Sequence, residues 1–369
     1  MVYRNLGNTG VRLSPLGFGM MRLPEDEKVV TKMVRDAIDA GVNYIDTAYC
    51  YLDGKSESLT GRVLSDGYRD KVYLATKSPV WLIEKETDFD RILNEQLRRL
   101  KTEQIDFYLL HSLNKSSWEK VKKFGLIDKM KAARDEGKIC WLGFSFHDTY
   151  DLFTEIVDAF DEWDFCQIQL NYLDTEYQAG IKGMEYAAEK GLGVIVMEPL
   201  RGGNLANVPE HIKDVFGSKK TPVEWSFDFL WDMPEIGTVL SGMSDETQVS
   251  QNVKYAQRSF VGMLTDEDKE VIKAVQKEFR KMDMVNCTAC SYCDVCPKKI
   301  AIPQIFKVYN SALSDGNKAK AKEQYMDLFP RLGAMPSECI ACHKCEEICP
   351  QHIKISDLIK KIHKFFEVT

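Results

Sequence analysis

The stretch DEKVVTKMVRDAIDAGVNYID, residues 26–46, decides the fold. From Glu27 to Ala40 its apolar side chains recur at three- and four-residue spacing, and Gly41 follows, which predicts an amphipathic helix that ends at the glycine. The next residues, Val42–Asp46, form a short apolar run that ends in a carboxylate and predict a buried strand. A helix that leads through a glycine into an apolar strand is typical of α/β proteins.

Apolar runs and amphipathic stretches alternate in the same way along the first two thirds of the chain, at a spacing that suits βα units and is too long for hairpins. The expected strands are Leu16–Met20, Val42–Asp46, Val72–Thr76, Phe107–His111, Ile139–Phe144, Phe165–Leu170, Gly193–Met197 and Gly237–Leu240. Eight such units predict an α/β fold of the (β/α)8 TIM-barrel type, which typically needs about 250 residues. A doubly wound open sheet is the alternative, but its Gly-x-Gly-x-x-Gly turn is not met, because Arg22 stands where the third glycine is needed. A β-hairpin, Tyr3–Leu6 with Val11–Leu13, is expected before the first strand.

Composition sets limits on the class of protein. The chain has 369 residues, of which 44% are hydrophobic and 28% charged, and this excludes a disordered or fibrous chain. A net charge of −7 argues against a general nucleic-acid binder. The first residues lack the apolar segment of a signal peptide, and no apolar run approaches the roughly 20 residues that span a bilayer. We therefore expect a cytoplasmic protein without a nucleic-acid or membrane partner.

The βα pattern stops near Thr265, and a predicted helix, Lys269–Lys281, leads to a region of different composition. Residues 284–369 contain 12 Lys and Arg against 9 Asp and Glu, so this region carries +3 and the rest of the chain −10. We predict a barrel over residues 1–264, a linking helix over 265–282 and a small, mainly α-helical domain over 283–369.

Eight of the 11 cysteines lie in that small domain, in two runs that each end in Cys-Pro. The runs are Cys287, Cys290, Cys293 and Cys296, then Cys339, Cys342, Cys345 and Cys349. Zinc sites usually take two separated Cys-x2-Cys pairs, whereas four close cysteines before a proline are typical of bacterial [4Fe–4S] ferredoxins. The second run matches the ferredoxin spacing in every gap, and the first is one residue shorter in its last gap. The pattern favours two [4Fe–4S] clusters over zinc.

Polar side chains follow three consecutive expected strands: Asp46 and Tyr51, then Lys77, then His111. Function lies at the C-terminal ends of barrel strands. A nearby ammonium would lower the pKa of the Tyr51 phenol, Asp46 would hold that ammonium, and His111 would hydrogen-bond a substrate oxygen. The set suits protonation of an alkoxide as it forms at a carbonyl. Taken singly, each residue also fits a structural role, as a surface lysine, a core histidine or a helix cap.

These residues resemble the aldo/keto reductase superfamily, over about residues 1–260. The resemblance rests on GVNYIDTAYCY (41–51), LATK (74–77), DFYLLH (106–111), GFS (143–145) and CQIQLNY (166–172). It implies hydride transfer between a nicotinamide and a carbonyl carbon, with Tyr51 as general acid, Lys77 and Asp46 assisting it, and His111 orienting the carbonyl. The whole arrangement also resembles the branch of the superfamily whose barrel is fused to a C-terminal ferredoxin-type [4Fe–4S] domain.

The resemblance further implies the residues that bind the cofactors. Ser145 and Gln167 would bind the nicotinamide carboxamide, Met197 would lie against its ring, and the adenosine phosphate end would meet Ser241, Gly242, Met243, Gln248 and Asn252. Met197 stands where many members have an aromatic residue, and the last loop lacks the Lys and Arg that grip a 2′-phosphate, so NADP(H) and NAD(H) both remain open. In two-cluster ferredoxins the fourth cysteine of each run binds the other cluster. This implies one set of Cys287, Cys290, Cys293 and Cys349, and another of Cys339, Cys342, Cys345 and Cys296.

The leading hypothesis is an NAD(P)H-dependent oxidoreductase that interconverts a small-molecule carbonyl and its alcohol, with two clusters that relay electrons to or from a redox protein partner. A hydride carries two electrons and a [4Fe–4S] cluster passes one at a time, so direct coupling needs a mediator such as a flavin. Two alternatives stay open: a plain carbonyl reductase with structural clusters, and a nucleotide-binding redox sensor without turnover.

Overall fold

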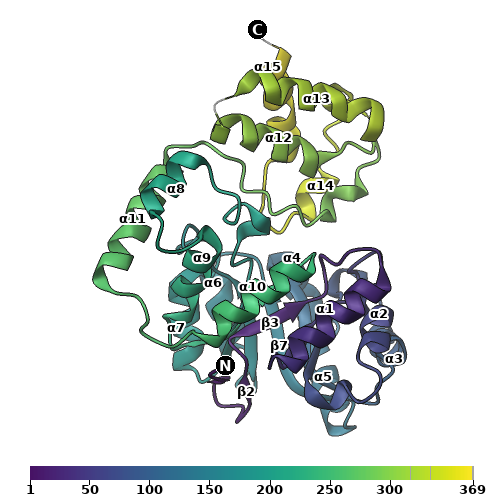
Figure 1. Ribbon diagram of the computed structural model, residues 1–369. Helices are drawn as coiled ribbons and strands as arrows, with labels where there is room; N and C mark the ends of the chain where they lie inside the picture. The colour runs from purple at the N-terminus through teal and green to yellow at the C-terminus, as the bar shows by residue number, and fades with distance from the viewer. Residues whose placement is uncertain (316, 333, 368–369) are drawn as a thin grey trace. The chain divides into compact units, whose positions relative to one another are not determined.

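The computed structural model describes residues 1–315, 317–332 and 334–367. The chain forms two compact units (Figure 1). The first, which we call the barrel unit, comprises Met1–Pro199 and Phe227–Leu264. The second, the cysteine unit, comprises Leu200–Ser226 and the described residues from Thr265 onward.

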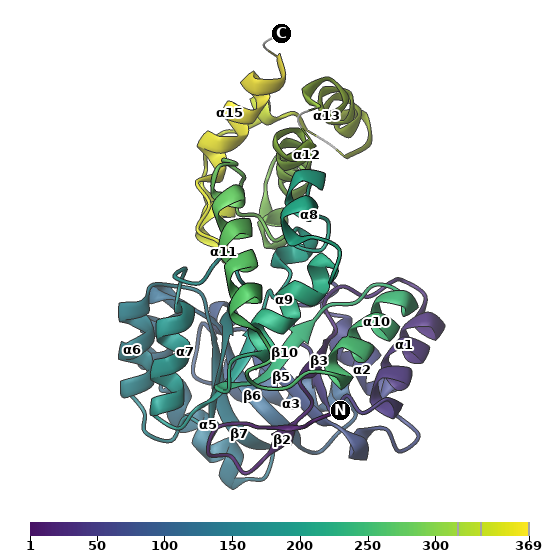
Figure 2. The same ribbon diagram turned by 60° about the vertical axis from the view of Figure 1, so that its left-hand side comes forward.

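The barrel unit is a closed barrel of parallel strands in the order β10, β3, β4, β5, β6, β7, β8, β9 (Figure 2). The strands are β3 (Leu16–Gly19), β4 (Tyr44–Asp46), β5 (Tyr73–Ser78), β6 (Ile105–Leu113), β7 (Ile139–Phe146), β8 (Phe165–Gln169), β9 (Gly193–Met197) and β10 (Ile236–Ser241). Each expected strand is present, with both ends within two residues of their predicted positions. The predicted (β/α)8 barrel is therefore confirmed, and the doubly wound alternative is wrong.

Helices alternate with the strands and surround them (Figure 2). They are α1 (Glu27–Asp39), α2 (Ser56–Val63), α3 (Asp88–Leu100), α4 (Lys115–Lys123), α5 (Leu126–Asp135), α6 (Tyr150–Asp158), α7 (Gly180–Glu189) and α10 (Glu246–Gln257), with short 3-10 turns η1 (Arg69–Lys71) and η2 (Val80–Leu82). Helix α1 begins where the Asp26 carboxylate accepts from the main-chain N–H groups of Lys28 and Val29. Gly41, at a φ of 106°, then turns the chain into β4.

A hairpin closes the amino-terminal end of the barrel. Its strands, β1 (Arg4–Asn5) and β2 (Arg12–Leu13), pair antiparallel, as predicted. The Leu6 side chain packs against the beginnings of β9 and β10, where a Cβ added to Gly193 or Gly237 would lie 2.3 or 2.6 Å from it. Leu6 belongs to a buried cluster with Tyr44, Phe107 and other interior side chains. The polar residues that follow the strands lie at the opposite, carboxyl end of the barrel.

The cysteine unit is built from helices and loops. Its elements are η3 (Arg201–Gly203), α8 (Glu210–Phe216), α11 (Asp266–Arg280), η4 (Tyr292–Val295), α12 (Ile302–Asp315), α13 (Lys318–Leu332), η5 (Pro336–Glu338), α14 (Lys344–Glu347) and α15 (Ile355–Glu367). Helix α9 (Pro222–Trp231) contains the boundary between the units. The core of the cysteine unit includes the buried residues Ile305, Tyr309, Tyr325, Ile359 and Ile362. Among the described residues, no helix is both long and apolar enough to cross a membrane.

The structure draws the domain boundaries differently from the sequence. We expected residues 200–226 in the barrel and 265–282 as a separate linking helix, but both segments belong to the cysteine unit. Arg201 Nε donates to Asn286 Oδ1 at 2.6 Å, and Asn204 Nδ2 donates to the Cys287 carbonyl at 3.1 Å. Gly202 lies against Thr288 so closely that a Cβ would be 2.3 Å from its carbonyl oxygen. These contacts tie the segment after Pro199 to the first cysteine run.

Candidate active site and cysteine cavities

Lys77 and Asp46 form a buried ion pair at the carboxyl end of the barrel. Asp46 ends β4, Lys77 is the last residue but one of the neighbouring strand β5, and the Lys77 side chain is fully buried. Lys77 Nζ donates to Asp46 Oδ2 at 2.7 Å and to the main-chain carbonyl of Thr47, also at 2.7 Å. The sequence did not predict the role of the Thr47 carbonyl, because every residue has a main-chain oxygen whatever its side chain. Two acceptors thus hold the ammonium in one position.

Tyr51 and His111 join this pair. Lys77 Nζ lies 4.9 Å from the centre of the Tyr51 ring. The ring of Tyr51 is 5.9 Å from that of His111 and at 78° to it, and the Trp81 ring is 5.0 Å from His111 on another side. The structure therefore brings all four predicted residues together, with an indole beside the imidazole.

Burial controls the protonation of these groups. It raises the pKa of Tyr51 well above its usual value, and the negative charge of Asp46 adds to this, while Arg22 acts in the opposite direction. We expected Lys77 to lower the pKa of Tyr51, but burial raises that pKa instead, and Arg22 is the cation that opposes the increase. Burial, and next the charge of Lys77, hold the pKa of His111 well below its usual value. At neutral pH the site presents a protonated phenol and a neutral imidazole.

The three residues expected at the nicotinamide lie on consecutive strands. Ser145 lies in β7, Gln167 in β8 and Met197 at the end of β9. Gln167 Nε2 lies 3.5 Å from the sulfur of Met197, and within the described residues the buried Gln167 Oε1 has no hydrogen-bond partner. Ser145 Oγ accepts from the main-chain N–H of Ser112 at 2.7 Å. The Gln167 oxygen can accept from an amide, and the Met197 thioether can pack against a flat ring, so the two residues fit the nicotinamide carboxamide and its ring.

The loop after β10 contains the residues expected at the adenosine phosphates. Asn252 Nδ2 donates to Ser241 Oγ at 3.2 Å, and Gln248 Oε1 accepts from the main-chain N–H of Ser244 at 3.0 Å. The Met243 side chain is fully buried, so only its main chain can face a ligand. Gly242 lies beneath the side chain of Arg22, since a Cβ added to Gly242 would be 3.1 Å from Arg22 Cδ. The sequence did not predict Arg22 at this site. Arg22 therefore places a cation beside a loop that has no Lys or Arg of its own.

The chain belongs to the aldo/keto reductase family, whose model matches residues 15–277, and is thus an oxidoreductase of a family that uses NAD(P)H. It is similar to the uncharacterized oxidoreductase YrpG of Bacillus subtilis, at 28% identity over 232 residues (56% of this chain and 68% of that protein). It is also similar to L-galactose dehydrogenase of Arabidopsis thaliana, at 28% identity over 290 residues (68% of this chain and 86% of that protein). In fold it is similar to the holo form of aldo-keto reductase AKR11C1 from Bacillus halodurans, with a TM-score of 0.63 and 24% identity over 74% of this chain and 96% of that one.

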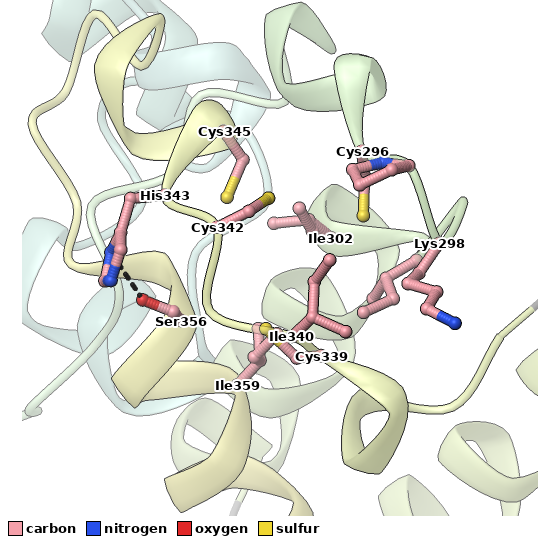
Figure 3. A pocket seen from close by; sticks show the side chains of 12 residues that line it. Cys296, Lys298, Ile302, Cys339, Ile340, Cys342, His343, Cys345, Ser356 and Ile359 are labelled. Carbon is pink, nitrogen blue, oxygen red and sulfur yellow. Dashed lines mark hydrogen bonds between the residues drawn. The ribbon is translucent and has the colours of Figure 1, made fainter.

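The eight clustered cysteines line two cavities in the cysteine unit. Cys296, Cys339, Cys342 and Cys345 line the first, where Figure 3 shows them around one space. Cys287, Cys290, Cys293 and Cys349 line the second. Each cavity thus takes three cysteines from one run and the last cysteine of the other. Ile302 lines both cavities, so one buried side chain is a shared wall between them.

The two cysteine runs have matching backbones. Left-handed residues occur in pairs at equivalent positions: Ala289 with Ala341 (φ 52° and 51°), Ser291 with His343 (62° and 58°), and Lys299 with His352 (53° and 48°). A positive φ is unfavourable for residues other than glycine and persists where the surroundings require it. The short helices η4 and α14 also occupy equivalent places. The same loop is therefore built twice, and each copy curves around its cavity.

Each cavity has the donor set of a [4Fe–4S] cluster, which is four thiols. All eight thiols are free of disulfides, and the remaining lining is largely apolar. No group of three or more His, Cys, Asp or Glu in the described part of the chain could hold a metal ion. A tetrahedral zinc site gathers four ligands about one ion, whereas a cubane cluster spreads its four thiolates over the corners of a cube. Burial raises the pKa of Cys345 to about 11, so without a bound cation this thiol stays protonated.

The lining of the first cavity also includes polar side chains. Lys298 and His343 both line it, and Ser356 Oγ lies 3.1 Å from His343 Nδ1 (Figure 3). Glu346 Oε2 lies 3.2 Å from the same nitrogen. His343 and Ser356 could not be found from the sequence, because nothing in the spacing of the cysteines marks them.

Proposed function

We propose that the chain is an NAD(P)H-dependent oxidoreductase that interconverts a small-molecule carbonyl and its alcohol at the carboxyl end of the barrel. We further propose that the cysteine unit holds two [4Fe–4S] clusters that relay electrons to or from a redox protein partner. The observation that carries the first part is the convergence of Tyr51, Lys77, Asp46 and His111 in one buried cluster. The observation that supports the second part is the division of eight cysteines between two cavities.

The barrel residues have complementary roles in the proposed reaction. A bound nicotinamide supplies or accepts the hydride. The protonated phenol of Tyr51 gives its proton to the substrate oxygen as negative charge develops there, and the Lys77 ammonium stabilises the phenolate that remains. Asp46 and the Thr47 carbonyl hold that ammonium in place. The neutral His111 hydrogen-bonds the same substrate oxygen and orients the carbonyl.

The cofactor is held by residues of β7 to β10 in this proposal. Gln167 accepts from the carboxamide, Met197 packs on the ring, and Ser145 lies beside them. The segment Ser241–Asn252 carries no Lys or Arg of its own; Arg22 lies against Gly242, and Lys32 pairs with Glu246 at 2.6 Å. Both NAD(H) and NADP(H) are therefore candidates, and titration of the protein with each decides between them.

The substitution Tyr51→Phe tests the barrel chemistry. It removes the proton donor and keeps the ring, so we expect kcat/KM for carbonyl reduction to fall by roughly 10²–10⁴-fold with the Kd for the nicotinamide unchanged. Tyr49→Phe is the matched control, because Tyr49 donates to Glu95 at 3.0 Å and takes no part in the cluster. Retained activity in Tyr51→Phe would show that the assignment is wrong.

The relay is tested by electron paramagnetic resonance. Anaerobic protein is mixed with NADH or NADPH, with and without a free flavin as mediator, and the cluster signals are recorded. Cluster reduction that depends on the nicotinamide supports the relay. Clusters that stay oxidised in every mixture, while carbonyl reduction proceeds, mean that they are structural and that the relay is wrong.

A further inference from the structure

We propose that Gln96 is a positioning residue that fixes Lys77 and Tyr51 for proton transfer; this inference rests on the proposed function of the barrel. Gln96 lies on α3 and is fully buried. Its amide nitrogen donates to the main-chain carbonyl of Lys77 at 3.0 Å and to Glu57 Oε1 at 2.7 Å. Its oxygen accepts from the hydroxyl of Tyr108 at 2.7 Å. Gln96 therefore connects a helix to β5 at the residue that carries the ammonium.

This network lies on the outer side of β5, behind the candidate active site. Successive side chains of a strand point to opposite faces, so Thr76 faces the helices while Lys77 faces the barrel interior. Thr76 Oγ1 donates to Glu57 Oε1 at 2.7 Å and lies 3.3 Å from Gln96 Nε2. Hydrogen bonds therefore hold the end of β5 at two points, the Thr76 side chain and the Lys77 carbonyl. Both points lie directly behind the Lys77 side chain.

Glu57 extends the network to the segment that carries Tyr51. It belongs to the first turn of α2, six positions after Tyr51. Its neighbour Ser56 lies with its hydroxyl 2.8 Å from Thr47 Oγ1, and the Thr47 carbonyl accepts from Lys77 Nζ. One buried network consequently holds both the strand that carries Lys77 and the helix that follows the Tyr51 loop.

The chemistry of the network favours positioning over stability. Glu57 is a fully buried carboxylate, and its Oε2 pairs with Arg99 at 3.2 Å. Replacement of a buried ion pair by apolar side chains of similar volume is often neutral or stabilising. Buried polar networks that are fully hydrogen-bonded instead impose one geometry on the elements they join. Here the joined elements are α2, α3, β5 and β6, and the geometry is that of the Tyr51–Lys77 pair.

The test is a double-mutant cycle of Gln96→Met and Lys77→Met in the full chain, assayed by NAD(P)H-dependent reduction of 4-nitrobenzaldehyde. Gln96→Met should lower kcat by roughly 10–100-fold, since a small displacement of a catalytic group has effects of this size. The Kd for the nicotinamide, measured by fluorescence quenching, should change less than about twofold, because its expected ligands lie on other strands. With Lys77 already replaced, Gln96→Met should lower kcat by less than about twofold, since Gln96 acts through Lys77.

Ser14→Ala is the control, because it removes buried hydrogen bonds to Leu16 and Asn43 at the amino-terminal end of the barrel. It should leave kcat unchanged. If Gln96→Met does not fold, Tyr108→Phe replaces it, since it removes the hydroxyl that donates to Gln96 and keeps the ring; it should lower kcat severalfold at constant Kd.

Two outcomes would overturn the inference, and a third would overturn the function on which it rests. Unchanged kcat in the folded variant overturns it. An equal loss with and without Lys77 overturns it too, because the effect is then general. Activity that survives in Tyr51→Phe overturns the proposed function itself, and this result does not depend on Gln96.

Discussion

Replacement of Lys77 by methionine should destabilise the barrel strongly and in a pH-dependent way. The side chains of Lys77 and Asp46 are 0% and 4% exposed, and their charged atoms are 2.7 Å apart. Methionine fills similar space but leaves the Asp46 carboxylate buried without its cation. Removal of one partner of a buried ion pair costs about 3–5 kcal/mol of unfolding free energy. This is a large part of the roughly 5–15 kcal/mol that stabilises a typical protein.

The pH dependence follows from the forces on Asp46. Burial raises its pKa, and the attraction of Lys77 opposes that increase. In Lys77→Met only the increase remains, so the folded-state pKa of Asp46 rises further above its unfolded value of about 3.9. A raised carboxyl pKa contributes stability that is fully present below the unfolded pKa and is lost as pH rises through the folded pKa. The loss in Lys77→Met should therefore be larger at pH 8 than at pH 5.

The assay is urea unfolding of the wild type, Lys77→Met, Asp46→Asn and the double variant at both pH values. We expect the double variant to be more stable than Lys77→Met at pH 8, because it buries no unpaired carboxylate. Its loss relative to the wild type should also vary less with pH than that of Lys77→Met. A loss below about 1 kcal/mol in Lys77→Met, or a loss that is equal at the two pH values, would refute the buried pair as the cause.

Three further results are expected. The pH profile of kcat/KM should show no ionisation near pH 6.5, because burial keeps His111 neutral; an inflection there that disappears in His111→Asn would contradict this. Gly202→Ala should lower the iron content of purified protein, because the added Cβ would collide with the main chain of the first cysteine run. Gly203→Ala should not, since Gly203 is also at a positive φ but has open space around it. Equal iron contents in the two variants would count against the clash. Cys349→Ser should weaken the signal of one cluster and Cys296→Ser that of the other, as recorded by electron paramagnetic resonance; loss of the same signal in both would contradict the exchange of the fourth cysteine.

The sequence predicted the barrel and the four residues at its carboxyl end for a simple reason. The carboxyl ends of parallel strands meet at one end of a barrel, so polar residues that follow consecutive strands must lie near each other. Asp46, Lys77 and His111 could be found in this way. Glu57 and Gln96 could not, because they lie on the buried faces of α2 and α3, where a polar residue looks like an irregularity of the pattern.

The protonation of the site and the boundaries of the units also needed the structure. Whether Lys77 or burial controls the pKa of Tyr51 depends on solvent exposure, which spacing does not give. The segment after Pro199 joins the cysteine unit through Arg201, Gly202 and Asn204, all of which look like ordinary loop residues in the sequence. By contrast, the grouping of the eight cysteines in space follows the set that the ferredoxin resemblance implied.

Iron and acid-labile sulfide analysis of the full chain, purified without oxygen, tests the proposal of a two-centre oxidoreductase most directly. Two [4Fe–4S] clusters predict about eight iron and about eight sulfide per chain, with an absorbance near 400 nm that dithionite bleaches. Stoichiometric zinc without sulfide would contradict the proposal, as would a chain that retains neither metal nor sulfide.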